Sequence, residues 1–154
     1  INPKGYVPVL ELGDDVCLTE VAAIVQYIAD RIPESGLAPR PFTLERYRLQ
    51  EWLGFVGAEL HKAFVPLFKP DTPDDYKRSV REGLAARLGY VAAHLGGRDY
   101  LVGDRFTVAD GYLFTVLGWC DAVGIDSGRW PALVAFQERV GQRQSVRDAL
   151  AAEG

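Results

Sequence analysis

Apolar residues form two short runs at the start of the chain and recur at helical spacing after that. Residues 6–12 are apolar and β-prone, a Gly-Asp-Asp turn follows, and residues 16–18 are apolar again, which predicts a β-hairpin. Proline cannot donate to a strand ladder, so Pro8 should sit at an edge, at a bulge or after a cis bond. Because a two-stranded hairpin is marginal in water, we expect further strands, from another chain or from a βαβ unit before Ile1.

Helical spacing begins directly after the hairpin. Thr19 is expected to cap a helix whose apolar positions recur every three or four residues and which ends at Asp30-Arg31-Ile32-Pro33. Proline and glycine then gather in residues 35–42, which predicts a linker. The chain is therefore divided into residues 1–34, this linker, and residues 43–154.

The part beyond the linker is predicted to be an all-helical bundle of about five helices. One apolar stripe runs along residues 43–66, with Leu49, Trp52, Leu53, Val56, Leu60 and Phe64 on one face. A second stripe runs along residues 74–95, includes Tyr76, and ends at a Gly-Gly pair.

The third helix of the bundle differs from the others because it is apolar on nearly every face. It begins at Thr107-Val108-Ala109-Asp110, a pattern that resembles a capping box, and is expected to run through Val123. A helix without a polar face should lie at the centre of the bundle. Residues 131–142 and 145–152 are predicted to form the last two helices.

The charge balance excludes several classes of function. The 154 residues include 17 Lys and Arg against 21 Asp and Glu, a net charge of −4, and a nucleic-acid binder needs a basic face. No apolar run approaches the ~18 residues of a membrane span, and no signal-peptide pattern opens the chain. We therefore expect a cytoplasmic protein with neither nucleic acid nor membrane as a partner.

Cysteine use is sparse and predicts neither a disulfide nor a metal site. Cys17 and Cys120 stand far apart, and the chain has no Cys-x-x-Cys pair and no His/Cys cluster at zinc spacing. Both are interpreted as buried free thiols that behave as small hydrophobic residues, with Cys17 facing the core from the second strand.

Two places near the start of the chain could hold a ligand. A cis-proline after Val7 would leave neighbouring main-chain groups free to pair with an extended ligand, although Pro8 could equally be a simple edge-strand proline. The helix start at Thr19-Glu20-Val21 offers free N–H groups that suit a carboxylate, while most such turns only cap a helix.

A third candidate lies on the first helix of the bundle. Gly54, Gly57, Ala58 and His61 stand at i, i+3, i+4 and i+7, so small residues lead up to an imidazole. Such a face can be the floor of a ligand groove or can allow close packing of another helix, and the pattern does not choose between them. His94, at a helix C-terminus, is interpreted as structural.

Several segments together resemble a known family. Residues 2–10 and 18–30 look like the second half of the thioredoxin-like domain of a glutathione S-transferase. Three further segments resemble the bacterial beta class of that family: Glu59-Leu60-His61-Lys62, Pro66-Leu67-Phe68 and residues 105–114. The resemblance covers essentially the whole chain. It implies a partial thioredoxin-like domain (hairpin plus helix) followed by the helical domain of that family.

The resemblance also implies roles for particular residues. In such proteins the residue before a cis-proline, here Val7, pairs with the cysteinyl part of glutathione, and Glu20 and Val21 hold its γ-glutamyl end. The beta-class histidine falls on His61. The neighbouring positions that line the site or face the partner subunit are Gly54, Ala58, Glu59, Leu60 and Lys62, and the Thr107…Asp110 pair matches a capping box that serves folding.

This chain departs from the family pattern at two of those positions. Gly54 stands where beta-class members often have Asn, so one polar contact to glutathione should be lost. Val21 stands where Gly or Ser is common, which removes a hydroxyl contact but keeps a backbone one. The family's first strand, helix and second strand, with the cysteine that touches the glutathione sulfur, are expected before Ile1, and Cys17 cannot replace that cysteine.

The resemblance implies a homodimeric enzyme that joins the glutathione thiolate to small hydrophobic electrophiles. Glutathione would be a co-substrate, and no tightly bound cofactor is expected. Thiol–disulfide exchange, reduction or isomerisation on the same scaffold are further activities that the resemblance leaves open. The alternative from another class is a truncated, non-catalytic module for dimerisation or for binding hydrophobic ligands.

Overall fold

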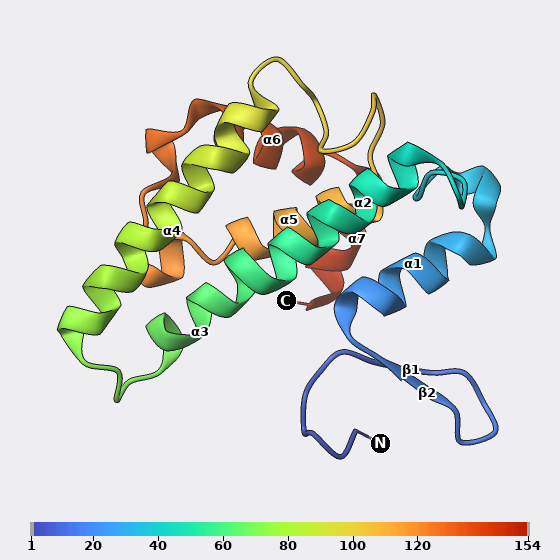
Figure 1. The fold of residues 1–154 in the computed structure, drawn as a ribbon, viewed down its shortest axis with the longest axis horizontal. Helices are drawn as coiled ribbons and strands as arrows, with labels where there is room; N and C mark the ends of the chain where they lie inside the picture. Colours follow the sequence, from blue (N-terminus) through green and yellow to red (C-terminus); the bar gives the residue numbers. More distant parts are fainter. Residues whose placement is uncertain (1, 154) are drawn as a thin grey trace.

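The chain begins with the predicted hairpin, which lies at one end of the molecule (Figure 1). The structure is a computed structural model and describes residues 2–153. Strands β1 (Val9–Glu11) and β2 (Cys17–Thr19) pair antiparallel, with Leu10 opposite Leu18. Pro8 lies just before β1 rather than within it, and the Val7–Pro8 peptide bond is cis, one of the three settings expected for this proline.

Helix α1 (Val21–Arg31) follows β2 almost directly. The prediction that Thr19 caps this helix is wrong, because Thr19 is the last residue of β2 and pairs with Val9. The cap position is held by Glu20, whose φ of 72° lies in the left-handed region and turns the chain from strand to helix. The carbonyl oxygen of Glu20 accepts hydrogen bonds from the N–H groups of Ala23 and Ile24, at 3.1 and 3.0 Å.

A buried arginine fastens the predicted linker. After a short 3-10 turn, η1 (Pro33–Ser35), the chain enters α2 (Leu44–Phe55). The Arg46 guanidinium of α2 pairs with the Asp30 carboxylate of α1, and its Nε donates to the carbonyl oxygen of Pro39 at 2.8 Å. A single side chain therefore joins α1, the linker and α2, and the linker is held in place although its sequence lacks regular periodicity.

The first helix of the bundle is interrupted. The expected single helix over residues 43–66 is instead α2, a π-helical segment η2 (Val56–His61), and α3 (Lys62–Phe68). A π turn adds a residue to the helical repeat, which rotates everything after it relative to a straight α-helix. The predicted apolar stripe is nevertheless confirmed, because all six of its residues are buried: Leu49, Trp52, Leu53, Val56, Leu60 and Phe64.

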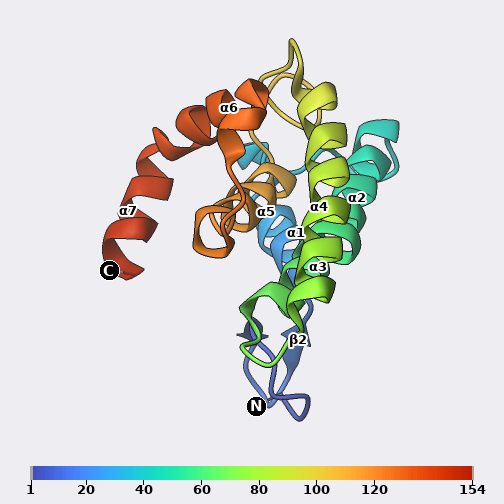
Figure 2. The ribbon, with the colours of Figure 1, turned by 90° about the vertical axis from the view of Figure 1, so that its left-hand side faces the viewer.

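Helix α4 (Asp74–Leu95) packs against α3 and η2, as the views in Figures 1 and 2 agree. It ends at Gly96 as predicted. Tyr76 does not belong to its buried stripe, because it is 56% exposed in the first turn, beside the loop that joins α3 to α4. The buried positions begin one turn or more later, at Leu84.

Helix α5 (Val108–Leu117) is central, as its sequence predicted. It packs against α1, α2, η2 and α6 (Pro131–Gly141), and Figure 2 shows it among these helices. It is shorter than expected, because Gly118 ends it and only the 3-10 turn η3 (Asp121–Val123) follows before Gly124. A second 3-10 turn, η4 (Ser127–Arg129), leads to α6, and α7 (Gln144–Glu153) closes the chain.

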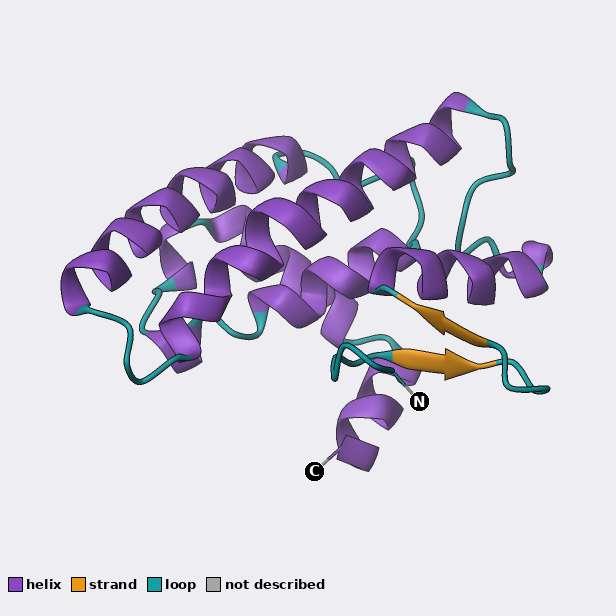
Figure 3. Ribbon diagram, turned by 60° about the horizontal axis from the view of Figure 1, so that its bottom comes forward, coloured by secondary structure: helices purple, strands orange, loops and turns teal. Residues whose placement is uncertain are grey.

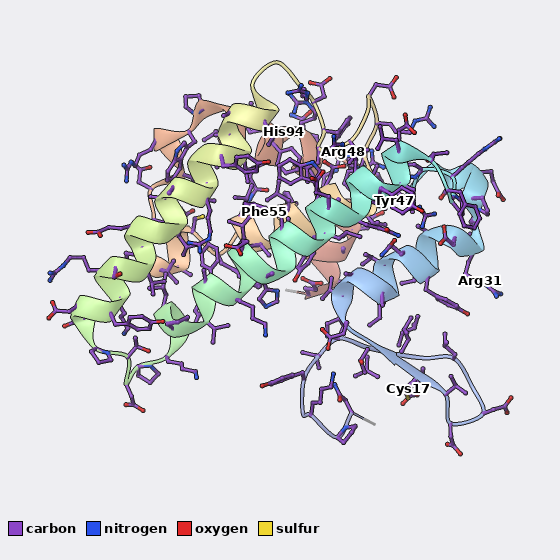
Figure 4. All side chains as sticks on the ribbon, in the orientation of Figure 1. Cys17, Arg31, Tyr47, Arg48, Phe55 and His94 are labelled. Carbon is purple, nitrogen blue, oxygen red and sulfur yellow. The ribbon has the colours of Figure 1, made fainter. Side chains whose placement is uncertain are left out.

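The hydrophobic core lies within the helices, and the hairpin sits outside it, below α1 in Figure 3. Helix α1 adds Ala22 and Val25 to the edge of that core. Cys120 is 1% exposed, as predicted. The prediction that Cys17 is buried is wrong: its side chain is exposed on the two-stranded hairpin (Figure 4), because nothing within residues 2–153 covers that position.

Within residues 2–153, no helix has both the length and the apolar character needed to cross a bilayer. The same residues contain no group of three or more His, Cys, Asp or Glu side chains arranged to hold a metal ion.

Candidate functional site

His61 lies at the end of η2, where the chain faces the central helix. Its Nδ1 is 2.8 Å from the hydroxyl oxygen of Tyr112 on α5, and the two rings meet edge to face with centroids 5.8 Å apart. The Trp119 indole also meets the imidazole edge-on, at 4.8 Å. Tyr112 on α5 and Trp119, which follows the end of α5, therefore both pack against the imidazole.

The surroundings of His61 favour a neutral imidazole. Burial lowers the pKa of His61 below its ordinary value, and the positive charge of Lys62 lowers it further. A neutral imidazole has one N–H and one acceptor nitrogen, so Nδ1 either donates to the Tyr112 hydroxyl or accepts from it, according to the tautomer. No residue of the described chain hydrogen-bonds to Nε2 of His61, which leaves that nitrogen available to a ligand.

Glu20 connects the start of α1 electrostatically to this pair. Burial raises the pKa of Tyr112 above its ordinary value, and the Glu20 carboxylate raises it further. Glu20 also pairs with Lys4, with Nζ to Oε1 at 3.0 Å, and both side chains are largely exposed. The carboxylate therefore sits at the junction of the hairpin, α1 and α5.

The backbone around the cis-proline and the start of α1 is open. Val7 is 89% exposed, so its main chain and side chain are accessible. In the described part of the chain the first two N–H groups of α1, of Val21 and Ala22, have no backbone acceptor, since Glu20 bonds only to the next two. Free N–H groups and the positive end of a helix dipole suit a carboxylate.

The row of small residues does not form one face in the structure. The π turn directs Gly57 toward α5, where a Cβ would lie 3.6 Å from the Tyr112 hydroxyl oxygen, whereas Gly54 and Ala58 are exposed. That distance is an ordinary van der Waals contact, so Gly57 lies beside the Tyr112 phenol but space alone does not require a glycine there. A Cβ on Gly54 would have no atom within 4 Å, so this position opens to solvent.

The remaining predicted residues of this segment fall in different surroundings. Leu60 is fully buried in the hydrophobic core, as its position in the predicted apolar stripe requires, and its place in the glutathione site stays a prediction. Glu59 is exposed and accepts a hydrogen bond from Nε of Arg87 on α4 at 2.8 Å. Lys62 is exposed beside His61.

The two structural predictions for the bundle hold. The Asp110 carboxylate, fully buried, accepts from the Thr107 N–H at 2.7 Å, the Thr107 hydroxyl at 2.8 Å and the Leu101 N–H at 2.8 Å, within a capping box. His94 bonds to the carbonyl oxygen of Leu101 at 2.9 Å and packs against Trp52, between α4 and α2 in Figure 4. Both are folding elements.

Two residues of the site were missed by sequence reasoning. Tyr112 and Trp119 lie in the segment predicted to be a helix that is apolar on nearly every face, although Tyr and Trp usually find a partner for their polar atom when buried. That polar atom was the available signal. Trp119 also meets Phe64 and Phe68 edge-on, at 5.7 and 6.0 Å, and Phe68 is 51% exposed. An apolar surface therefore adjoins His61.

Comparison with known proteins places the chain among relatives of one kind. The family model for the glutathione S-transferase C-terminal domain matches residues 55–144. A glutathione S-transferase of Escherichia coli O157:H7, GstA, is 47% identical over 154 residues, which are 100% of this chain and 77% of the relative.

Solved structures agree with the sequence comparison. BphK, a bacterial enzyme of this kind solved as a ternary complex, superposes with a TM-score of 0.97 at 55% identity, and the match covers 99% of this chain and 76% of BphK. A sphingomonad glutathione S-transferase complexed with glutathione gives 0.96 at 49% identity, and the beta-class enzyme of Sphingomonas chungbukensis gives 0.95 at 48%, both with the same coverage.

Proposed function

This chain belongs to the glutathione S-transferase family, with relatives in its bacterial beta class, and we propose that glutathione binds beside His61 and is joined there to small apolar electrophiles. The general activity, glutathione conjugation, follows from the family. The placement of the site, the class of electrophile, the dimer and the compartment are our inferences.

A single observation carries the placement of the site: Nδ1 of His61 lies 2.8 Å from the Tyr112 hydroxyl oxygen, and no residue of the described chain hydrogen-bonds to Nε2. An N–H at Nε2 can donate to the sulfur of a bound thiolate and stabilise it. In conjugation the thiolate attacks the electrophilic carbon, a C–S bond forms, and the leaving group departs with its electron pair. The role of His61 comes before the attack, when its Nε2 proton stabilises the thiolate.

The other end of glutathione suits the start of α1. Its γ-glutamyl group carries both a carboxylate and an ammonium. The open N–H groups of Val21 and Ala22 can donate to the carboxylate, and Glu20 can pair with the ammonium in place of Lys4. The main chain of Val7, set by the cis bond to Pro8, is positioned for the cysteinyl part between them. Gly54, Ala58, Glu59 and Lys62 are proposed as neighbouring positions of the same site.

The apolar surface next to His61 supports an apolar electrophile. Phe68 and Trp119 form it, and Val65 of α3 is 42% exposed nearby in sequence. Aromatic and aliphatic side chains stabilise an apolar molecule through the hydrophobic effect rather than by specific polar contacts. A small hydrophobic substrate with an activated carbon is therefore the best match.

We propose that a second copy of the chain binds at a groove between α2 and α4, away from His61. There Trp52, Phe55 and Tyr90 form an aromatic cluster in a groove bounded by Glu51, with Phe55 between α2 and α4 in Figure 4. Tyr90 is 58% exposed. Aromatic side chains are enriched at interfaces, and a second copy packed here would remove the exposed apolar surface of this cluster from water. The reducing cytoplasm, where thiols stay reduced, is the compartment that suits the reaction.

Retention on immobilised glutathione and conjugation of an aromatic halide, followed by absorbance, test this function together. We expect retention, specific elution with free glutathione, and turnover. Retention without turnover would support a binding module instead. The absence of both retention and turnover would refute the proposed site. Analytical ultracentrifugation of wild type and Phe55→Asp tests the dimer: the variant should sediment as a monomer, and an unchanged dimer would move the interface elsewhere.

A further inference from the structure

The Tyr112 hydroxyl can donate one hydrogen bond, and one acceptor lies within reach. Its oxygen lies 2.8 Å from Nδ1 of His61, and within residues 2–153 no other hydrogen-bond partner contacts it. If Nδ1 carried the imidazole proton and donated it, the phenol proton would be left without an acceptor in a half-buried site. An unmade hydrogen bond of that kind is costly, so the opposite direction is favoured.

We propose that Tyr112 is a positioning residue that donates its hydroxyl proton to Nδ1 of His61 and thereby holds the imidazole as the tautomer protonated at Nε2. This inference rests on the proposed function for its consequence, because the Nε2 proton would then donate to the glutathione sulfur. The assignment of the tautomer itself depends only on the contacts of His61.

Packing around Tyr112 supports a fixed geometry. The ring lies on α5, against Gly57 of η2, where a Cβ would approach the hydroxyl oxygen to 3.6 Å and the ring to 3.7 Å. The phenol therefore packs against Gly57 at ordinary contact distance while its hydroxyl reaches Nδ1 of His61. The Trp119 indole also packs edge to face with this imidazole, with ring centroids 4.8 Å apart, and limits rotation of the ring.

The charged groups around the pair are consistent with a neutral imidazole and a protonated phenol. Lys62 adjoins His61 on the same segment, Glu20 acts on Tyr112 from the start of α1, and on the α4 side Glu59 is already paired with Arg87. Burial of both rings disfavours either charge. Between the lowered pKa of the imidazole and the raised pKa of the phenol, the imidazole is neutral and the phenol keeps its proton as a donor.

Nitrogen-15 NMR of the imidazole in the 154-residue chain tests the tautomer without any substrate. In wild type we expect the two-bond ¹H–¹⁵N pattern of a ring protonated at Nε2, with Nδ1 shifted by hydrogen bonding. Tyr112→Phe should move the Nδ1 resonance toward the value of an unbonded nitrogen. Tyr76→Phe, at an exposed tyrosine of α4, is the matched control and should leave the resonances unchanged.

Kinetics separates a positioning role from a merely structural one. Tyr112→Phe should lower kcat for conjugation roughly three- to tenfold, as expected for one lost hydrogen bond, with little change in KM for glutathione. It should also move the acidic limb of the pH–rate profile, since the imidazole pKa changes. Thermal unfolding of the variant verifies that the fold is retained.

The outcomes separate this proposal from the function on which it draws. The role of Tyr112 would be overturned if the wild-type ring were protonated at Nδ1. It would also be overturned if Tyr112→Phe changed neither the Nδ1 resonance nor the pH–rate profile. Absence of conjugation in wild type, with the tautomer as expected, would refute the proposed function and leave the assignment of the tautomer standing.

Discussion

The indole of Trp119 meets the imidazole of His61 edge-on, with ring planes 81° apart. Because Trp119 also contacts Phe64 and Phe68, the same side chain belongs to the core, to the exposed apolar surface and to the wall of the proposed site. Binding of an apolar substrate on this surface would place it directly beside the imidazole. The geometry thus places the exposed apolar surface directly beside His61, the residue that we propose acts on the thiol.

Replacing His61 with alanine should lower kcat for aromatic-halide conjugation by roughly ten- to a hundredfold, because one hydrogen bond to a charged sulfur would be lost. His94→Gln is the matched control: this ring bonds to the Leu101 carbonyl away from the site, so the variant should lower stability and keep turnover per folded molecule. Unchanged kinetics in His61→Ala would remove His61 from the mechanism.

Gly54→Asn should be accepted by the fold and should strengthen glutathione binding. A Cβ there has no neighbour within 4 Å, and Asn is slightly better than Gly in a helix interior, by up to about 0.5 kcal/mol. The added amide can supply the polar contact that the resemblance to the beta class led us to expect as lost. Isothermal titration should show tighter binding for Gly54→Asn and no change for Gly54→Ala, and equal affinities in both would exclude Gly54 from the site.

Asp110→Asn should destabilise the fold by about 2 kcal/mol, because the carboxylate accepts three hydrogen bonds while fully buried. Burial raises the pKa of Asp110. The folded state therefore keeps the proton at pH values where the unfolded chain has lost it, and the contribution of this carboxyl to stability falls as pH rises through the raised pKa. Urea unfolding across about pH 4 to 7 should show the advantage of wild type over Asp110→Asn shrinking with pH. An advantage that grows with pH would contradict this.

Arg46→Ala should lower the free energy of unfolding by about 2 kcal/mol, because it removes the pair with Asp30 and the bond to the Pro39 carbonyl. The Asp30 side chain is 45% exposed, so solvent screens the lost pair and keeps the cost below that of a fully buried one. Arg48→Ala, two residues away and paired with Glu51 in water, is the control and should unfold like wild type. Equal denaturation curves for both variants would show that the arginine does not hold the linker.

The two thiols should react very differently with an aromatic disulfide reagent. Burial, with the nearby Asp121 carboxylate, raises the pKa of Cys120 to about 11, so near pH 8 only roughly one molecule in a thousand carries the thiolate. Cys17 is exposed. One thiol per native chain should react quickly, and Cys17→Ser should abolish that reaction. Rapid reaction of two thiols in native protein would contradict the burial of Cys120.

Much of the fold follows from local patterns. The stripe over residues 43–66, the Gly96 stop and the Thr107…Asp110 capping box depend on side chains a few residues apart, and each was predicted. The failures have a common physical reason. Thr19 was lost to strand pairing with Val9, and Cys17 stayed exposed because no part of residues 2–153 packs over it, so contacts between elements decide both.

Periodicity and local motifs were enough to predict the helical domain and the hairpin, and the resemblance of several segments to glutathione S-transferases indicated the family and pointed to His61. The surroundings of that histidine depend on long-range packing. Tyr112 lies 51 residues further along the chain, and Trp119 lies beyond it, so no local pattern could report their contacts. The π turn and the packing of α5 bring the three rings together, and Nε2 of His61 is left without a hydrogen-bond partner among the described residues.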